Sequence, residues 1–376
     1  MNNDPDVLVS GAGIVGRCLA LSLARLGLQV ALRPDAPRPG AGEDVRAYAL
    51  NAASVALLRG LKVWDALPAH AATPVWDMAI RGDAGEGASP GRLGFSAWDQ
   101  RVAELAWIVD AAALERELGN AVRFAPHLTL LAPDAEPRSA LTALCEGKAS
   151  ARRDALGVHF VRHDYGQTAI AARLTSSAPH RGTARQWFRA PDVLALLPFD
   201  APMPQRSYAL VWSLPASRAG ELLALDAADF EQALNDATGG DAGVLALGSE
   251  RAAWPLMLAQ AEAWCGPGWV LLGDAAHVVH PLAGQGLNLG LADVAALTTV
   301  LAAREPWREL GDARLLRRYA RERLAPTWAM GRVTDGLLHL FSHPAPVARE
   351  LRNRGLSLVN QLSPVKRWLA ARALES

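Results

Sequence analysis

Two glycine-bearing segments, one starting at Gly11 and one at Gly273, carry the residue types most able to handle a dinucleotide. The first reads GAGIVG, from Gly11 to Gly16, and directly follows an apolar run over 7–9. In such a turn Gly11 permits the tight bend, Gly13 lets the backbone approach a pyrophosphate, and Gly16 lets the next helix pack closely. The positive end of that helix would stabilise the phosphate charge. This segment therefore predicts nucleotide binding.

The second segment points to a flavin in particular. An apolar run ends at Gly273 and Asp274, and an acid in that place can reach a polyol such as the ribityl chain of FAD. The stretch from Pro281 to Gly286 then forms a predicted loop that leads into a predicted helix. The N-terminus of this helix could face the negative charge that a reduced flavin carries near N1 and O2. Together the two segments predict FAD rather than a nicotinamide cofactor.

Two further positions fit a nucleotide site less specifically. A ribose-binding acid is expected about 20 residues after the glycine turn. Asp35 stands one place beyond that position, and Arg33 and Pro34 occupy it. Either the strand end is shifted or the ribose contact is lost. Arg46 precedes a predicted helix, where a guanidinium could hold a phosphate, whereas a lone arginine after a flexible loop is usually solvated.

The histidines and cysteines do not favour a metal site. His277 and His280 have the spacing of a ligand pair, but no acidic or cysteine partner accompanies them. We expect packing or a backbone hydrogen bond instead. The three cysteines, Cys18, Cys145 and Cys265, are widely spaced and form no CxxC motif, which indicates neither a disulfide framework nor a zinc site.

Composition narrows the class of protein. The chain has 376 residues, of which 51% are hydrophobic and 20% charged, enough to bury a large core in two domains or one composite one. Because the formal net charge is zero, nothing supports nucleic-acid binding. We expect no signal peptide and no membrane span, and hence a cytoplasmic protein.

The elements that position the glycine segments alternate strand and helix. A strand over 6–10, the glycine turn, a helix over 17–26 and a strand over 29–32 form one nucleotide-binding unit. The middle of the chain has strand-like runs broken by proline, glycine and histidine, which indicate an antiparallel sheet. These runs lie at 158–173, 182–189, 193–198 and 207–214. Helices are predicted over 52–61, 226–238, 286–303, 310–340 and 346–373, and a buried strand near 269–272.

We therefore predict an α/β fold: a Rossmann-like FAD-binding domain, an inserted antiparallel-sheet substrate domain and a helical C-terminal region. The predicted FAD-binding domain comprises 1–75, 101–157 and 265–340; the substrate domain comprises 76–100 and 158–264; the tail is 341–376.

The order of these motifs resembles that of the single-component flavoprotein aromatic hydroxylases, typified by p-hydroxybenzoate hydroxylase. GxGxxG is followed by DxRxxAL at 44–50, by an acid-GxxSxxR motif at 146–153 and by the run 273–293. The branch of ubiquinone biosynthesis is the most similar. That closer resemblance rests on residues 163–170, 179–184, 273–293 and 351–356.

The resemblance implies a role for each matching residue. Gly11, Gly13 and Gly16 would bind the ADP half of FAD, Arg46 would lie near its phosphates, and Asp274 beside Gly273 would hold the ribityl hydroxyls. Glu146 and Arg153 would serve FAD and the nicotinamide donor, and Asp35 is kept as a ribose ligand. The catalytic loop at the flavin ring would comprise Pro281, Gly284, Gln285 and Gly286, extended by Leu287 and Asn288.

The chain departs from the family pattern on the nucleotide side. Members usually carry Asp at the position of Glu146 and Glu at that of Pro34, and the stretch 126–140 is shorter here. These departures concern nicotinamide docking and adenosine-ribose binding. They leave the flavin-ring side unchanged.

The implied reaction is hydroxylation of a polyprenyl phenol or quinol in ubiquinone biosynthesis. NADH or NADPH would reduce FAD, and O₂ would form a flavin C4a-hydroperoxide that transfers one oxygen to the ring. No general base stands out from spacing. Two alternatives stay open: hydroxylation of a small soluble aromatic compound, and a non-catalytic FAD-binding subunit within a biosynthetic complex.

The C-terminal stretch suggests peripheral membrane contact. From residue 349 onward, cations outnumber acids and alternate with apolar residues, as in a helix that lies on an anionic membrane. The cations are Arg349, Arg352, Arg354, Lys366, Arg367 and Arg372, against Glu350 and Glu375. The alternative is an ordinary packed terminal helix. On the first reading, this cytoplasmic protein would be peripheral at the inner membrane face.

Overall fold

The computed structural model of the protein describes residues 4–35, 44–83, 91–279 and 285–342. A six-stranded sheet, in the order β16-β17-β9-β1-β2-β8, forms the nucleotide-binding part. Its strands are β1 (Val7–Ser10), β2 (Val30–Arg33), β8 (Leu128–Leu130), β9 (Leu141–Leu144), β16 (Cys265–Gly266) and β17 (Trp269–Leu271). All pairs are parallel except β16 with β17. Strands near the N-terminus and strands at residues 265–271 thus contribute to one sheet.

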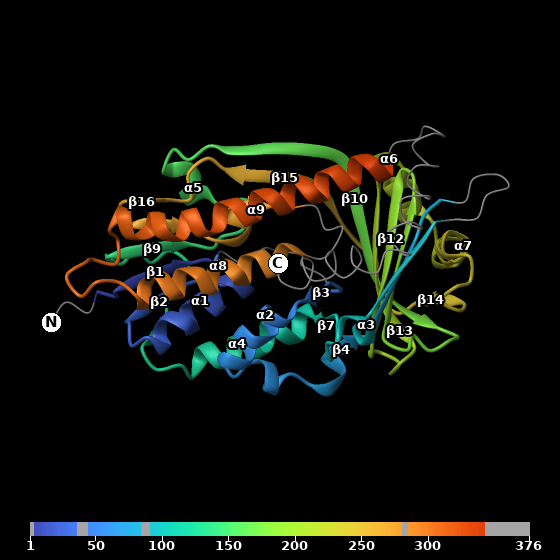
Figure 1. Cartoon of the computed structure of the whole chain (residues 1–376), viewed down its shortest axis with the longest axis horizontal. Helices are drawn as coiled ribbons and strands as arrows, with labels where there is room; N and C mark the ends of the chain where they lie inside the picture. The colour runs from blue at the N-terminus through green and yellow to red at the C-terminus, as the bar shows by residue number, and fades with distance from the viewer. Residues whose placement is uncertain (1–3, 36–43, 84–90, 280–284, 343–376) are drawn as a thin grey trace.

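Helices cover this sheet because the first three residues of each central strand, β1 and β2, are apolar. All four residues of β1 and of β2 are buried. The main helices are α1 (Ile14–Arg25), α2 (Ala52–Gly60), α4 (Ala111–Arg123), α8 (Gln285–Ala302) and α9 (Ala313–Ser342). Helix α1 packs against α4 and α8, and α8 packs against α9. Figure 1 shows α1, α8 and α9 side by side.

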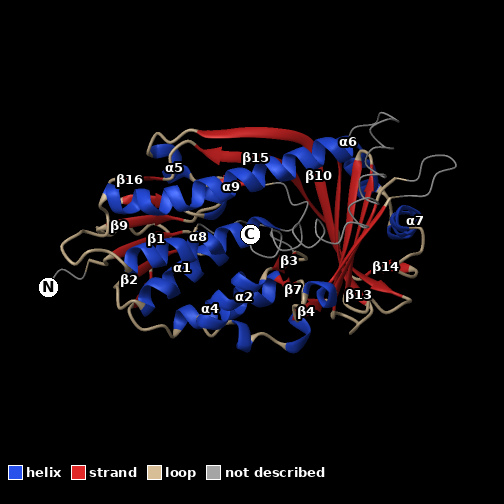
Figure 2. Cartoon of the chain, viewed as in Figure 1, coloured by secondary structure: helices blue, strands red, loops and turns tan. Residues whose placement is uncertain are grey.

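A second, mainly antiparallel sheet lies at the far end of the molecule from β1 and β2 (Figure 2). Its order is β18-β15-β10-β13-β12-β11-β5-β6, and β14 (Leu245–Leu247) also pairs with β10. The strands are β5 (Asp77–Arg81), β6 (Arg92–Ser96), β10 (Phe160–Ser176), β11 (Thr183–Arg189), β12 (Asp192–Phe199), β13 (Ser207–Pro215), β15 (Ala252–Ala261) and β18 (His277–Val278). Its helices are α6 (Ala216–Ala224) and α7 (Ala227–Thr238), whose Phe230 and Leu234 pack with Trp212 in a separate core.

Two long strands join the two parts. β10 and β15 pair over most of their length, and β10 runs along the molecule from the nucleotide-binding part into the second sheet (Figure 1). A register shift between Asp164 and Gln167, beside Gly166 at φ 62°, bends β10. A three-stranded sheet of β4 (Ala72–Val75), β7 (Ala106–Asp110) and β3 (Ala47–Leu50) adjoins them. Short helices are α3 (Ala97–Gln100) and α5 (Ala151–Ala155).

The predicted α/β class is confirmed, including the strand-turn-helix-strand unit and the sheet-rich insert. The helix predicted from residue 17 begins three residues earlier, at Ile14, directly after the glycine turn. The sequence did not predict α4, α6 or the three-stranded sheet. The domain boundaries stay a prediction, and the predicted helix over 346–373 lies outside the described residues.

Candidate cofactor and active site

The GxGxxG turn has the close contacts that only glycine allows. Gly11 has φ +100°, and a Cβ there would lie 2.4 Å from the carbonyl oxygen of Cys145. A Cβ on Gly16 would lie 1.8 Å from the oxygen of Gly11. Gly13, at the N-cap of α1, differs because nothing lies within 4 Å of its Cβ position. The first and third glycines are therefore required by packing, whereas the second faces open space that a pyrophosphate could enter.

The second glycine segment meets this turn at the first residues of α1. Gly273 (φ +57°) begins the short helix η3 (Gly273–Ala275), and its Cβ position is 3.2 Å from Val15 Cγ2. Gly290 of α8 is closer still to Val15: a Cβ there would lie 2.7 Å from Val15 Cγ2 and 3.4 Å from the Cα of Gly273. Two segments far apart in the sequence therefore form adjacent walls at the N-terminus of α1.

Asp274 lies where several charged groups converge. Its side chain is exposed, yet the protein around it raises the pKa of its carboxyl group by desolvation, against the positive charges of His277, Lys148 and Arg46. Burial raises the pKa of Tyr48 to about 12, an effect to which the charge of Asp274 also contributes. The Arg46 segment, the β9–α5 loop and η3 are therefore close enough to influence one another electrostatically.

Arg46 is half-exposed and held by carboxylates. Its Nε and Nη2 donate to the two oxygens of Asp44 at 2.8 and 2.7 Å, and Nη2 lies 3.7 Å from Glu115. The hydrogen bond with Asp44 raises the pKa of Arg46, which stays charged. Although burial opposes it, the same pairing lowers the pKa of Asp44. A phosphate would have to compete with Asp44 for this bidentate donor pair.

Arg173 on β10 positions the Arg46 segment from the other sheet. Its Nη2 donates to the carbonyl oxygen of Arg46 at 2.8 Å and to Asp110 at 2.9 Å. Its guanidinium also lies 4.0 Å from the ring centroid of Phe199. Arg173 was not predicted as a functional residue, because a single arginine in a strand carries no local signal of its partners.

A buried ion cluster holds η3 against α8 and α9. Asp293 accepts hydrogen bonds from the backbone N–H of Gly273 (3.0 Å), from His277 Nε2 (2.7 Å) and from Arg323 Nε (2.8 Å). Burial would raise the pKa of Asp293, but His277 and Arg323 outweigh it and lower the pKa. His277 also stacks on Trp264, with ring centroids 5.0 Å apart.

The stacking on Trp264 agrees with the packing role expected for His277, whereas its hydrogen-bond partner is the carboxylate of Asp293, an acidic partner that the sequence did not predict. Asp293 was overlooked, although an acid within the apolar stretch of α8 is a signal of a buried partner. His280 lies outside the described residues.

The predicted catalytic loop is described only in part. Pro281 and Gly284 lie outside the described residues, whereas α8 begins at Gln285. Gly286 and Leu287 are half-buried in its first turn. Asn288 accepts hydrogen bonds from Asn51 N (3.1 Å) and Ser54 Oγ (2.7 Å), and donates to Ala49 O at 2.8 Å. Its side chain thus ties the start of α8 to β3 and α2.

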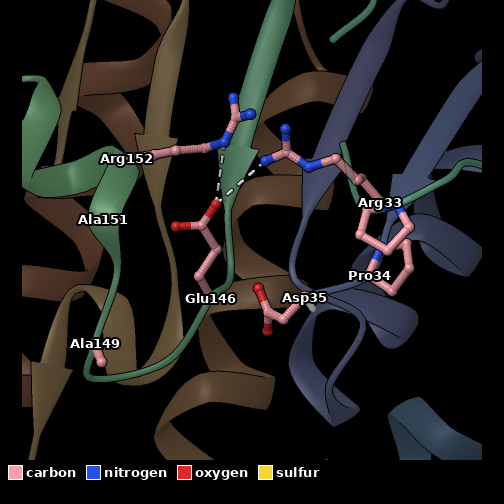
Figure 3. A pocket seen from close by; sticks show the side chains of 8 residues that line it. Arg33, Pro34, Asp35, Glu146, Ala149, Ala151 and Arg152 are labelled. Atoms are coloured by element: carbon pink, nitrogen blue, oxygen red, sulfur yellow. Dashed lines mark hydrogen bonds and ion pairs between the residues drawn. The ribbon is translucent and has the colours of Figure 1, made fainter. Parts of the chain in front are cut away.

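The end of β2 opens into a recess of about 210 Å³. Its lining residues are Arg33, Pro34, Asp35, Pro133, Glu146, Ala149, Ala151 and Arg152 (Figure 3). This is where a dinucleotide fold binds the adenosine ribose. Asp35 is exposed there, and in Figure 3 its carboxylate stands apart from the charged pairs above it.

The carboxylate of Glu146 is occupied by protein donors. Ser10 Oγ and Ser150 Oγ (2.7 Å) both donate to it, and Arg33 and Arg152 pair with it at 3.3 and 3.4 Å. Arg33 is itself buried. Glu146 therefore neutralises the buried guanidinium of Arg33 at the carboxyl end of β2, a role that the sequence did not predict.

Arg153 is buried within the protein. It donates to the carbonyl oxygens of Ala275 (3.2 Å) and Lys148, pairs with Asp154 at 2.9 Å, and lies 3.8 Å from the ring centroid of Phe160. These contacts link α5 to η3. The direct roles predicted for Arg153 and Glu146 in FAD and nicotinamide binding stay predictions.

A buried histidine, His180, lies in the loop between β10 and β11. His180 Nδ1 accepts from the N–H of Gly182 (3.0 Å), so Nε2 carries the hydrogen that faces Asp200 at 3.3 Å. Burial lowers the pKa of His180, although the hydrogen bond with Asp200 opposes this shift. Because both ring nitrogens bond to nearby turns, His180 stabilises the fold of this segment, and no general base is assigned.

Comparison with known proteins places this site in a family. Residues 130–334 match the model of the FAD-binding domain family. The chain is 31% identical over 394 residues to ubiquinone hydroxylase UbiL of Rhodospirillum rubrum, covering 98% of this chain and 89% of that protein. It is 30% identical over 410 residues to 3-demethoxyubiquinol 3-hydroxylase of Escherichia coli, covering all of both chains.

Solved structures agree on the fold. PqsL of Pseudomonas aeruginosa, in complex with 2-aminobenzoylacetate, superposes with a TM-score of 0.76 at 21% identity, covering 94% of this chain and 99% of that one. Fold and site together define a flavin-dependent monooxygenase. The chain belongs to the FAD-binding domain family, and the resemblance to its hydroxylases is confirmed.

The residues present fit FAD. Open space at Gly13, an exposed acid at Asp274 and the recess beside Asp35 lie along the carboxyl ends of the parallel strands, where such folds bind nucleotides. In the described part of the chain, no helix is long and apolar enough to cross a bilayer.

Proposed function

We propose that this protein hydroxylates the aromatic ring of a polyprenyl phenol or quinol in ubiquinone biosynthesis, with NADH or NADPH as electron donor. Support comes from two hydroxylases, UbiL and 3-demethoxyubiquinol 3-hydroxylase, that match nearly the whole chain. The observation that supports the proposal is the packing of Gly273 on Val15, which places Asp274, the residue we propose to bind the ribityl chain, close to the start of α1.

The chain's own residues would hold FAD along its length. The N–H groups at the start of α1, beside Gly13, would bind the pyrophosphate, and Asp35 would accept hydrogen bonds from the adenosine ribose. Asp274 would accept from the ribityl hydroxyls, and the first turn of α8, from Gln285, would face the flavin ring. FAD supplies the activation of O₂ and the oxygen transfer.

The surrounding contacts fix these groups in place. Asp293 holds the N–H of Gly273 and thereby orients Asp274, while Asn288 sets the position of the first turn of α8. Glu146 neutralises Arg33, so that the recess at the end of β2 keeps its shape. Positioning of this kind supports catalysis by exclusion of water and orientation of the reacting atoms.

Purified protein tests the proposal directly. It should be yellow with bound flavin, and a phenol should stimulate its oxidation of NADH or NADPH. Quinone intermediates that accumulate in a deletion strain would identify the ring position. A soluble aromatic that stimulates turnover, together with an unchanged quinone pool, would favour the small-molecule alternative. FAD binding without turnover would favour a scaffold subunit.

We also propose peripheral membrane contact through the tail 349–376, which lies outside the described residues. Its excess of cations among apolar residues supports this proposal. Deletion of the tail should lower association with anionic vesicles. Unchanged co-sedimentation of folded, truncated protein would refute it.

A further inference from the structure

Helix α9 has two very different faces. Its inner face is apolar: Leu315, Leu316 and Tyr319 are fully buried, and the Tyr319 hydroxyl donates to the carbonyl oxygen of Leu271 at 2.9 Å. Its outer face follows the spacing of three and four residues that marks one side of a helix. It consists of Arg314, Arg317, Arg321, Leu324 and Trp328, all exposed, and is called the α9 outer face below.

The arginines of this face are available for an external partner. Among the described residues, Arg314, Arg317 and Arg321 form no ion pair, whereas Arg318 and Arg323 of the same helix pair with Glu305 and Asp293. Arg317 Nε donates to the carbonyl oxygen of Ala313, and Arg321 Nε to that of Arg317. These bonds hold the side chains along the helix and leave most guanidinium N–H groups uncommitted.

Large apolar side chains continue the same stripe. Leu324 is 37% and Trp328 59% exposed, on the turns that follow the arginines. Arginines beside an exposed tryptophan and leucine are typical of a helix lying at a membrane surface, where the cations meet lipid phosphates and the indole sits at headgroup level. An acidic protein would satisfy the arginines but would not by itself explain the adjacent exposed apolar pair.

We propose that the α9 outer face docks on an anionic lipid bilayer. The inference rests on the proposed function, since a polyprenyl substrate resides in the membrane.

The test uses the full-length, FAD-loaded protein and vesicles of phosphatidylglycerol with phosphatidylcholine. R317Q/R321Q should lower the vesicle partition coefficient about 30-fold, roughly fivefold per arginine. The matched control is R101Q/R123Q, which removes two exposed arginines elsewhere; α4, which ends at Arg123, is separated from α9 across the molecule in Figure 1. W328S should also weaken binding, whereas W98S, which removes a tryptophan that is 88% exposed, should not.

Several outcomes would overturn the proposal. These are no co-sedimentation of the wild type with anionic vesicles, equal loss in R317Q/R321Q and R101Q/R123Q, or capture of an acidic protein without vesicle binding. Flavin content and phenol-stimulated oxidation of NADH should be normal in R317Q/R321Q, because the side-chain hydrogen bonds of both arginines go to α9 itself and to none of the proposed FAD ligands. Loss of vesicle binding with normal oxidation thus separates docking from the hydroxylase proposal. R317Q/R321Q in protein lacking 349–376 shows whether α9 acts without the tail, as the proposal requires.

Discussion

At the scale of single residues, the two glycine segments could be recognised from the sequence because Gly11, Gly16 and Gly273 meet local backbone requirements. Gly11 and Gly16 are required by contacts below 3 Å, and their spacing is fixed by the turn itself. Glu146 and Arg153 were found by motif, but their contacts could not be foreseen. Both depend on partners such as Arg33 and Ala275 that only the folded sheet brings near.

Asp274 provides a test at this scale, through stability and affinity together. The pKa of Asp274 is raised in the folded protein, so the unfolded state ionises first as the pH rises. The free energy of unfolding therefore falls between the ordinary pKa near 3.8 and the raised pKa of the folded state, and stays lower above it. Below about 3.8 both states are protonated, and the effect disappears. D274N should therefore raise the melting temperature of FAD-free protein at pH 7, by an amount that vanishes as the pH falls below about 4. Thermal denaturation across pH measures this.

The same variant should bind FAD on the order of tenfold more weakly, since a charge-assisted hydrogen bond is lost. Fluorescence quenching of FAD gives the affinity. E221Q, at an exposed position on α6, is the matched control and should change neither property. Tighter FAD binding by D274N would contradict the assignment of Asp274 to the ribityl chain.

At the scale of elements, most strands and helices near the cofactor were predicted, whereas their mutual attachments were not. Helix α8 shows why: its apolar sequence predicts a buried helix, but nothing local shows that Asp293 and Asn288 would bond to η3, β3 and α2. Likewise β10 looked like one strand among several, and its span across both sheets follows from pairing with β15.

Asn288 allows the attachment of α8 to be tested. N288A removes hydrogen bonds to Ser54 and Ala49 and leaves buried backbone groups without partners, so we expect a loss of about 2–4 kcal/mol in the free energy of unfolding. FAD affinity should also fall, because the first turn of α8 is released. N120A, which removes an exposed asparagine on α4, should cost less than about 0.5 kcal/mol. Urea denaturation monitored by circular dichroism measures both, and equal effects would disprove the attachment.

At the scale of the whole molecule, strands near the N-terminus and strands at residues 265–271 share one sheet, so cofactor binding should stabilise segments that are distant in sequence. Amide hydrogen exchange should slow on FAD addition at residues 11–17 and at 273–277, with little change in α7. At 100 times the dissociation constant, FAD should add about 2.7 kcal/mol to the free energy of unfolding. Protection confined to the first segment would mean that η3 does not share the site.

The central claim is that the Gly11 turn and the Gly273–Asp274 segment bind one FAD molecule between them. A crystal structure of the protein with FAD tests it most directly. We predict the pyrophosphate on the N–H groups beside Gly13 and a ribityl hydroxyl within 3.2 Å of an Asp274 carboxylate oxygen. An FAD bound with its ribityl chain far from Asp274, or outside the α1 N-terminus, would contradict the account.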